Sequence, residues 1–429
     1  MLNRSVQPSI CQPDQLVVQV PERTVMPNGV PLNVLNVGSN DVVRIDWLMA
    51  GGRWQQAQPL QAVFTNRMLR EGTRRYSAAE IAEKLDYFGA WLELSTTFEY
   101  SYITLYSLNR YLPQTLDVLE SVIKEPVFPE KELGIVLANN LQQFLVNLSK
   151  VDFLARRALV KSVYGEQHPC GKLVEESDYQ RIHPAVLKEF YNQYYHSGNC
   201  SIYLSGLVNE DCLHRIERLF GTEPFGCGRP LADKKDYAVV PAAGKRIFIE
   251  RSDALQSAVC MGTLSIGRKH PDYLKARVLM TLFGGYFGSR LMSNIREEKG
   301  YTYGISAGLE PSPGGGMMAI TAETANEFVE PLIREIYVEI DKLQNDLVGK
   351  DELKMVQNYM LGDMCRSYES AFSLADAWMF IQVYGLSDTF FKDSLDAVKE
   401  VTPWEIRDLA EKYLCKENLK EVIAGKKIS

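Results

Sequence analysis

The sequence has few residues of the kinds that form local metal sites or cross membranes. Only five of its 429 residues are histidine, and the closest two, His183 and His196, are thirteen positions apart. The eight cysteines include no Cys-x-x-Cys pair. Local zinc motifs need such close spacings, so none is expected from histidine or cysteine. No apolar run approaches the length of a membrane span, so no membrane contact is expected either.

Basic charge is also in short supply. Lysine and arginine (47) are outnumbered by aspartate and glutamate (54), which gives a net charge of −7. Nucleic acid is bound through basic surface, so it is not an expected partner. Residues 1–15 lack the positive start and apolar core of a secretion signal and the arginine-rich pattern of a transit peptide. Scattered cysteines in so long a chain are typical of reduced thiols, which predicts a cytoplasmic protein.

An internal repeat predicts two domains, as the length of the chain also suggests. At an offset of about 215 residues, both halves show a strand, two helices, a hairpin and a long amphipathic helix in the same order. The first half has the strand 42–49, helices 59–70 and 77–88, hairpin strands 91–95 and 100–106, and helix 113–124. The second half has the strand 257–264, helices 271–283 and 289–299, hairpin strands 302–309 and 317–323, and helix 327–343.

Local signals mark the boundaries of these elements. A Ser77-x-x-Glu80 capping box opens one helix and Gly89 closes it, while the run PSPGGG at 311–316 predicts the turn of the second hairpin. Residues 221–243 hold six glycines or prolines and predict a linker. The expected organisation is an N-terminal domain at 1–220, this linker, and a C-terminal domain at 244–429, both of the α+β class.

Two segments resemble the pitrilysin/insulinase family of zinc peptidases. MLREGT at 68–73 resembles the Met-Leu-x-x-Gly-Thr motif that follows the inverted zinc signature His-x-x-Glu-His of that family. SRLMSNIREEKGYTY at 289–303 resembles the segment that carries the family's arginine and tyrosine pair. The resemblance covers nearly the whole chain. It implies two homologous domains, each an antiparallel-rich sheet with helices packed on it.

The alignment places the zinc signature on residues 63–67, where no metal ligand is present. Val63 has no lone pair, and the amide of Asn66 cannot act as a base. Arg67 stays protonated and would repel a cation. Zinc needs two imidazoles one helical turn apart, and its bound water needs a glutamate as base. The sequence therefore predicts that this chain binds no metal and does not hydrolyse peptides at this site.

The family's third ligand, a glutamate on a later helix, corresponds to the stretch 132–140. Ala138, Asn139 and Asn140 stand where carboxylates are expected, although Glu132 could be a displaced acid. His168, in the segment QHPCG, is similar to a His-Pro-Tyr-Gly turn of the family and is interpreted as structural. The alternative, a Cys170 nucleophile with His168 as its base, is disfavoured because residues two apart in a proline turn rarely face each other.

The arginine and tyrosine of the family correspond to Arg296 and Tyr303. In related peptidases this pair reaches from the second domain toward the zinc site, and both groups donate hydrogen bonds without changing protonation. The resemblance implies that they bind the substrate carbonyl or the oxyanion of the transition state. The alternative is a solvated arginine and a packed tyrosine. Leu291 and Ile295 are expected to anchor the helix, and Tyr301 to pack.

Two further segments are candidates for peptide binding, since the family's substrates add as a strand to a sheet edge. One is 90–95, with Ala90, Trp91 and Leu92 in the place of the edge strand beside the zinc site. The other is FGGYFG at 283–288, with Gly284 and Gly285. This glycine segment is either a flexible stretch near the chamber or a turn between helices.

These observations predict a non-catalytic, peptide-binding subunit. Its expected partner is a paralogous chain that holds zinc and the general base, to which Arg296 and Tyr303 are supplied across the interface. Three alternatives remain: a homodimeric chamber that binds peptides without cutting them, a structural core subunit, and, least favoured, an active zinc endopeptidase.

Overall fold

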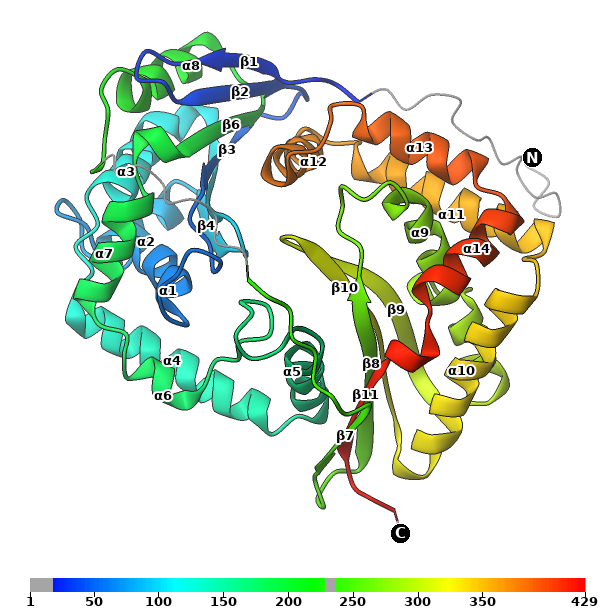
Figure 1. Ribbon diagram of the computed structural model, residues 1–429. Coiled ribbons are helices and arrows are strands. Elements are labelled where there is room, and N and C mark those ends of the chain that lie inside the picture. The colour runs from blue at the N-terminus through cyan, green and yellow to red at the C-terminus, as the bar shows by residue number, and fades with distance from the viewer. Residues whose placement is uncertain (1–17, 228–236, 429) are drawn as a thin grey trace, which may run out of the picture.

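The computed structural model describes residues 18–227 and 237–428, and it shows two α+β halves that face each other, each with its own sheet (Figure 1). The interpretation of residues 1–15 as lacking a signal lies outside the described residues, as does 228–236 of the predicted linker. Within the described ranges, no helix is both long and apolar enough to cross a membrane.

The first half contains one six-stranded sheet with strand order β1-β2-β6-β3-β5-β4. Its elements are β1 (Glu22–Val25), β2 (Pro31–Asn36), β3 (Val42–Met49), α1 (Gln61–Met68), α2 (Ala78–Tyr87), β4 (Trp91–Thr96), β5 (Ser101–Leu108), α3 (Leu112–Lys124), α4 (Glu130–Leu148), α5 (Val151–Tyr164), α6 (Glu176–Tyr179), α7 (Pro184–Tyr194), β6 (Cys200–Gly206) and α8 (Glu210–Ile216).

The second half contains a five-stranded sheet with order β7-β11-β8-β10-β9. Its elements are β7 (Arg246–Glu250), β8 (Gln256–Ser265), α9 (Tyr273–Met280), the wide helical turns η4 (Thr281–Gly285) and η5 (Met292–Glu298), β9 (Thr302–Ser312), β10 (Gly315–Ala325), α10 (Val329–Asn345), α11 (Lys350–Ser367), α12 (Ala371–Tyr384), α13 (Phe390–Glu400), α14 (Pro403–Tyr413) and β11 (Lys420–Gly425).

The two sheets confirm the predicted repeat and the α+β class. The order β2-β6-β3-β5-β4 of the first half is reproduced by β7-β11-β8-β10-β9 in the second. In both sheets the first of these pairs is parallel and the others are antiparallel. Strand β9, which carries Tyr303, is thus the counterpart of β4, and both are edge strands.

Most predicted boundaries hold, but the turn of the second hairpin was predicted too long. Strands β9 and β10 run to Ser312 and from Gly315, so only Pro313 and Gly314 connect them. Gly314 has a φ of 80° and makes the turn, whereas a side chain on Gly316 would approach the Ile266 carbonyl oxygen to 2.8 Å. This second glycine serves close strand packing. The capping box at Ser77 is present as predicted.

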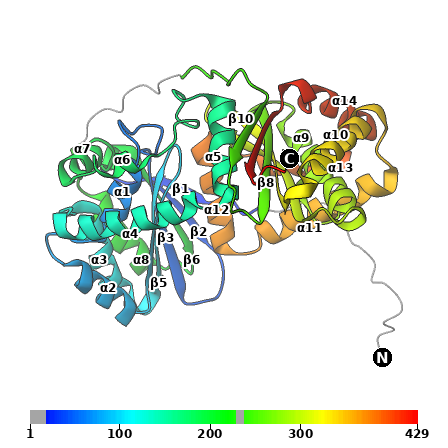
Figure 2. The ribbon, with the colours of Figure 1, turned by 90° about the horizontal axis from the view of Figure 1, so that it is seen from below.

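The two halves exchange a helix. Helix α5 of the first half covers the inner face of the second sheet, where Leu159 packs with Cys260 and Val422. Helix α12 of the second half covers the inner face of the first sheet, where Trp378 packs with Leu35 and Tyr203. Figure 2 shows both helices between the two sheets. Neither sheet is fully covered by its own half, so the halves share one folded unit.

An ion-pair network reinforces this exchange. Arg44 of β3 donates from Nε to Asp46 Oδ1 at 2.9 Å and from Nη2 to Asp376 Oδ1 of α12 at 2.5 Å. Thr104 also donates to Asp46 Oδ1, at 2.7 Å. Asp46 is completely buried, and this burial raises its pKa to about 6 despite the attraction of Arg44.

Candidate functional site

In the first half, Asn66 connects helix α1 to the β4–β5 hairpin. Its Nδ2 donates to the carbonyl oxygens of Ser95 and Tyr102, at 2.8 and 3.1 Å. Its Oδ1 accepts a hydrogen bond from the Tyr195 hydroxyl at 3.1 Å. Asn66 is 1% exposed. An amide can donate to two carbonyls and a carboxylate cannot, so this position now serves packing.

The other positions of the zinc signature are equally unsuited to a metal. Val63 and Arg67 are half-buried and, four residues apart, share one face of α1. On α4, Asn140 accepts from the Tyr179 hydroxyl at 2.9 Å. Within residues 18–227 and 237–428, no three His, Cys, Asp or Glu side chains are placed to hold a metal ion. The zinc that the resemblance implies does not fit this donor set.

His168 is a structural residue, as predicted. It is 3% exposed, stacks on Tyr164 at 5.0 Å and contacts the edge of Trp54. Its Nδ1 accepts the backbone N–H of Cys170 at 3.2 Å. Burial lowers the pKa of His168 and raises the pKa of the Cys170 thiol to about 11. The thiol is therefore protonated at neutral pH, and His168 Nδ1 is occupied by a backbone N–H, which rules against the nucleophile reading.

In the second half, Arg296 and Tyr303 lie side by side at an exposed edge. The guanidinium carbon of Arg296 is 5.4 Å from the centre of the Tyr303 ring. Tyr303 is 91% exposed and lies on edge strand β9. The supporting helix is fixed as predicted, because Leu291 and Ile295 are fully buried. The pair is thus presented on the surface rather than packed in the core.

Phe287 completes this group and was not predicted. Its ring centre lies 4.4 Å from the guanidinium carbon of Arg296, although 63% of the residue is exposed. In the described part of the chain, no carboxylate lies within ion-pair distance of Arg296. The signal that could have identified it is an aromatic residue within the glycine segment 283–288, of which only the glycines are predicted to have a role from the sequence.

Polar contacts fix the helical segment that carries Arg296. Asn294, which is buried, donates from Nδ2 to Glu335 at 3.0 Å and to Glu339 at 2.7 Å on α10. Arg290 forms a two-pronged ion pair with Glu352 of α11, at 2.7 and 3.0 Å. These contacts hold the backbone around Arg296 from two helices, which keeps its guanidinium in a defined position.

The other sequence candidates differ in what they expose. Strand β4 is an edge strand, but Ala90 and Leu92 are buried in the core and only Trp91 is exposed, at 66%. Gly285 is exposed, whereas Gly284 is buried against β9. A side chain on Gly284 would come within 2.7 Å of the Ala307 backbone nitrogen. This glycine is required by packing, which matches the helix-to-helix turn. Tyr301 stacks on Phe328 at 4.9 Å, as expected of a packing residue.

A cleft of about 800 Å³ opens beside Tyr303. It lies between α5 and strands β8, β9 and β10, on the sheet face that α5 covers. The polar residues along it are Asp152, Arg156, Gln256, Thr302, Ser306, Thr321 and Glu323. The cleft therefore offers both hydrogen-bond donors and acceptors beside Tyr303.

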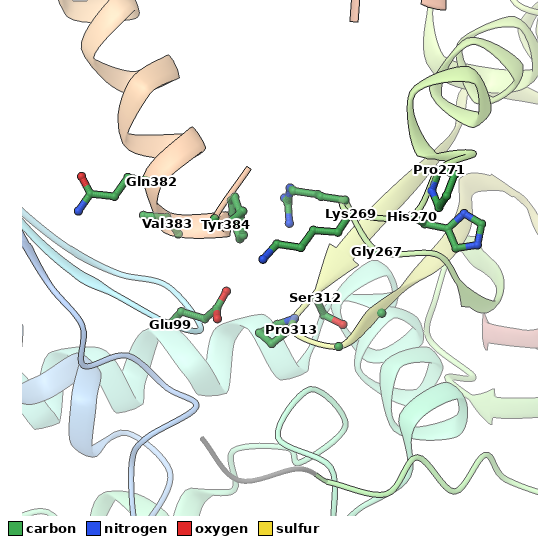
Figure 3. Close-up of a pocket in the computed structure, with 14 residues that line it drawn as sticks. Glu99, Gly267, Lys269, His270, Pro271, Ser312, Pro313, Gln382, Val383 and Tyr384 are labelled. Atoms are coloured by element: carbon green, nitrogen blue, oxygen red, sulfur yellow. The ribbon is translucent and has the colours of Figure 1, made fainter. Parts of the chain in front are cut away.

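A second pocket, of about 690 Å³, lies between the halves (Figure 3). Lys269 and Glu99 extend into it from opposite sides. The Lys269 ammonium lies beside Gly385, at the C-terminal end of α12, where a cation stabilises the free carbonyls. Neither Arg296 nor the zinc-signature residues line this pocket. The structure also separates the zinc-signature positions from Tyr303, since α1 and β9 belong to different halves and lie on opposite sides of the molecule in Figure 1.

The doubled fold, with no metal ligand at the positions of the inverted zinc signature, defines the class: a zinc-peptidase fold without its own zinc ligands. The family models agree with this. Residues 61–166 match the family described as insulinase (peptidase family M16), and residues 181–360 match the peptidase M16 inactive domain. The chain belongs to peptidase family M16.

Some relatives of this chain are named as zinc proteases and one is named as a non-peptidase homolog. The chain is 25% identical to the uncharacterized zinc protease YmxG of Bacillus subtilis, covering 81% of this chain and 85% of that one. It is 26% identical to the non-peptidase homolog YmxG of Helicobacter pylori over 56% of this chain and 55% of that one.

Solved structures show the same fold. The peptidase M16 inactive domain of Pseudomonas fluorescens matches with a TM-score of 0.86 at 23% identity, covering 95% of this chain and 99% of that one. The periplasmic protease PqqL of Escherichia coli matches with a TM-score of 0.78 at 14% identity, and the match covers 100% of this chain but 48% of PqqL.

Proposed function

We propose that this chain is a non-catalytic, peptide-binding subunit of an M16 peptidase. It supplies Arg296 and Tyr303 to a partner subunit that holds zinc and the general base. One observation carries the proposal. The zinc-signature positions hold no metal ligand and Asn66 is buried in packing, while Tyr303 is exposed and the half-buried Arg296 has its guanidinium carbon 5.4 Å from the Tyr303 ring centre.

The chemistry of the two side chains suits a role in trans. A guanidinium and a phenol both carry hydrogen-bond donors and can donate to a carbonyl oxygen or to the oxyanion that forms from it. They need no metal of their own. Donors of this kind each contribute roughly 100- to 1,000-fold to the rate when they are correctly placed.

The length of one solved neighbour, PqqL, supports a two-unit assembly. PqqL accommodates the whole of this fold in 48% of its length, so a further stretch of similar length remains in that protein. A chamber made of two such units could be formed here by two chains. A subunit with a purely structural role would have no need to expose Tyr303 at 91%.

The proposal is tested by reconstitution. The full chain, a paralogous M16 chain with an intact His-x-x-Glu-His, and their mixture are assayed on an unstructured fluorogenic peptide. We expect hydrolysis by the mixture and at most weak hydrolysis by either chain alone. Peptide binding by a homodimer of this chain, with no gain of activity in any mixture, would favour the non-hydrolytic chamber instead. Tightly bound zinc at about one per chain would contradict the proposal.

A further inference from the structure

We infer that Phe287 is a positioning residue that holds the Arg296 guanidinium beside Tyr303. This inference rests on the proposed function, because it concerns how the donor pair is kept ready for a substrate. It adds a residue that lies nine positions before Arg296 and outside the helix that carries it.

The geometry places Arg296 in contact with two exposed rings. Its guanidinium carbon lies 4.4 Å from the centre of Phe287 and 5.4 Å from the centre of Tyr303. A ring face attracts a cation within about 6 Å but accepts no conventional N–H···O hydrogen bond in doing so. The guanidinium is therefore held while its N–H groups stay available for an incoming oxygen.

Another arginine of this chain shows the contrasting arrangement. Arg407 lies 4.7 Å from the ring of Trp404, which is also exposed, at 56%. That guanidinium faces the carboxylates of Asp408 and Glu411 at 3.4 and 3.5 Å. Its charge is neutralised within the protein. Arg296, in contrast, has aromatic contacts and no ion pair with any described residue.

The segment before Phe287 is built to keep the ring in place. Gly284 packs directly against Ala307 of β9, and Gly288 lies under the ring of Tyr286. Tyr286 in turn stacks on Tyr359 of α11 at 4.9 Å. These contacts fix the backbone on both sides of Phe287. Because 63% of Phe287 is exposed, burial contributes little to holding its ring, and the cation–π contact with Arg296 is the ring interaction that the structure shows for it.

A first experiment measures the contact without any partner. The full chain and its F287A, F287Y and W404A variants are treated with phenylglyoxal, and modification of Arg296 is followed by peptide mass spectrometry. An exposed cation–π contact corresponds to about a two- to fivefold change in an equilibrium. We expect F287A to speed modification of Arg296 by about this factor, and F287Y and W404A to leave it unchanged. An unaltered rate in F287A would overturn the inference.

A second experiment separates this inference from the proposed function. In the reconstituted mixture, F287A is expected to lower kcat about two- to fivefold with little change in KM, and F287Y to restore it. If R296A lowers activity but F287A does not, Phe287 has no positioning role, but the proposed function is still supported. If R296A also has no effect, the proposed function itself has failed. W404A is the matched control and should leave activity unchanged.

Discussion

The Tyr195 hydroxyl donates to Asn66 Oδ1 over 3.1 Å, at the position where the inverted zinc signature carries its glutamate. Both residues are buried, and Asn66 also donates to two carbonyl oxygens of the β4–β5 hairpin. A side chain with three buried hydrogen bonds is part of the core. The position that carries the general base in the zinc signature is therefore a structural position in this chain.

Asn66→Asp is expected to destabilise the fold, because a carboxylate would face the carbonyl oxygens of Ser95 and Tyr102. Buried groups left unsatisfied in this way cost roughly 1–3 kcal/mol each. We expect the free energy of unfolding, measured by urea denaturation, to fall by at least about 2 kcal/mol.

Arg67→Ala is the control for this substitution, since Arg67 belongs to the same signature but is half-buried and has no ion pair among the described residues. It should change stability by less than about 1 kcal/mol. A stability of Asn66→Asp equal to that of the control would show that the amide is not needed.

Asp46 predicts a pH dependence of stability. Its pKa is about 6 in the folded chain, raised by burial, and near 4 when unfolded. Between these two pH values the Asp46 carboxyl binds its proton more tightly in the native state than in the unfolded state. This group's stabilising contribution is therefore fully present below about pH 4 and is lost as pH rises through about 6.

The check compares the wild-type chain with Asp46→Asn by denaturation at pH 4.5 and at pH 7.5. The wild-type free energy of unfolding should fall relative to that of the variant by on the order of 2 kcal/mol between these pH values. The exposed Asp363→Asn should follow the wild type. Parallel curves for the wild type and Asp46→Asn would mean that Asp46 is ionised as easily when folded as when unfolded.

The helix exchange predicts that the chain unfolds as one unit. Trp378 of α12 is 2% exposed and packs on the sheet of the other half. Trp378→Ala should cost about 3–5 kcal/mol and shift a single calorimetric transition for the whole chain. Trp404→Ala, at an exposed site, should leave the transition in place. Two separate transitions would show that the halves are independent.

Substitutions at Gly284 and Gly304 test whether the glycine segment near the arginine–tyrosine pair is needed for packing or for flexibility. A side chain on Gly284 would strike Ala307, while one on Gly304, beside Tyr303, would meet open space. Gly284→Ala should therefore lower the free energy of unfolding by about 1–3 kcal/mol. Gly304→Ala should stay within about 0.5 kcal/mol of the wild type. Equal, small effects would favour a flexible glycine stretch.

Sequence patterns predicted the elements because each carried its own local signal. The predicted strand 42–49 matched β3, and the Ser77 capping box marked the start of α2. The repeat also predicted matching sheets. The helix exchange had no such signal, because the apolar faces of α5 and α12 do not show which sheet they cover.

Sequence was sufficient where the chemistry of a side chain alone excludes a role, and it was not sufficient where a residue's role depends on its packing partners. Val63 and Arg67 cannot be zinc ligands in any fold. The sequence could not show that Asn66 had become a buried hydrogen-bonding residue, since its partners Ser95, Tyr102 and Tyr195 lie 29 to 129 positions away. Phe287 was missed for a similar reason. Its contact with Arg296 depends on the turn that Gly284 and Gly288 make possible.

The central claim is tested most directly by the kcat of the reconstituted mixture when this chain carries Arg296→Ala. With the zinc-bearing partner unchanged, we predict a loss of roughly 100- to 1,000-fold, as for other oxyanion donors. Arg407→Ala, a surface arginine stacked on Trp404, should retain full activity. Unchanged hydrolysis by the Arg296→Ala mixture would contradict the account.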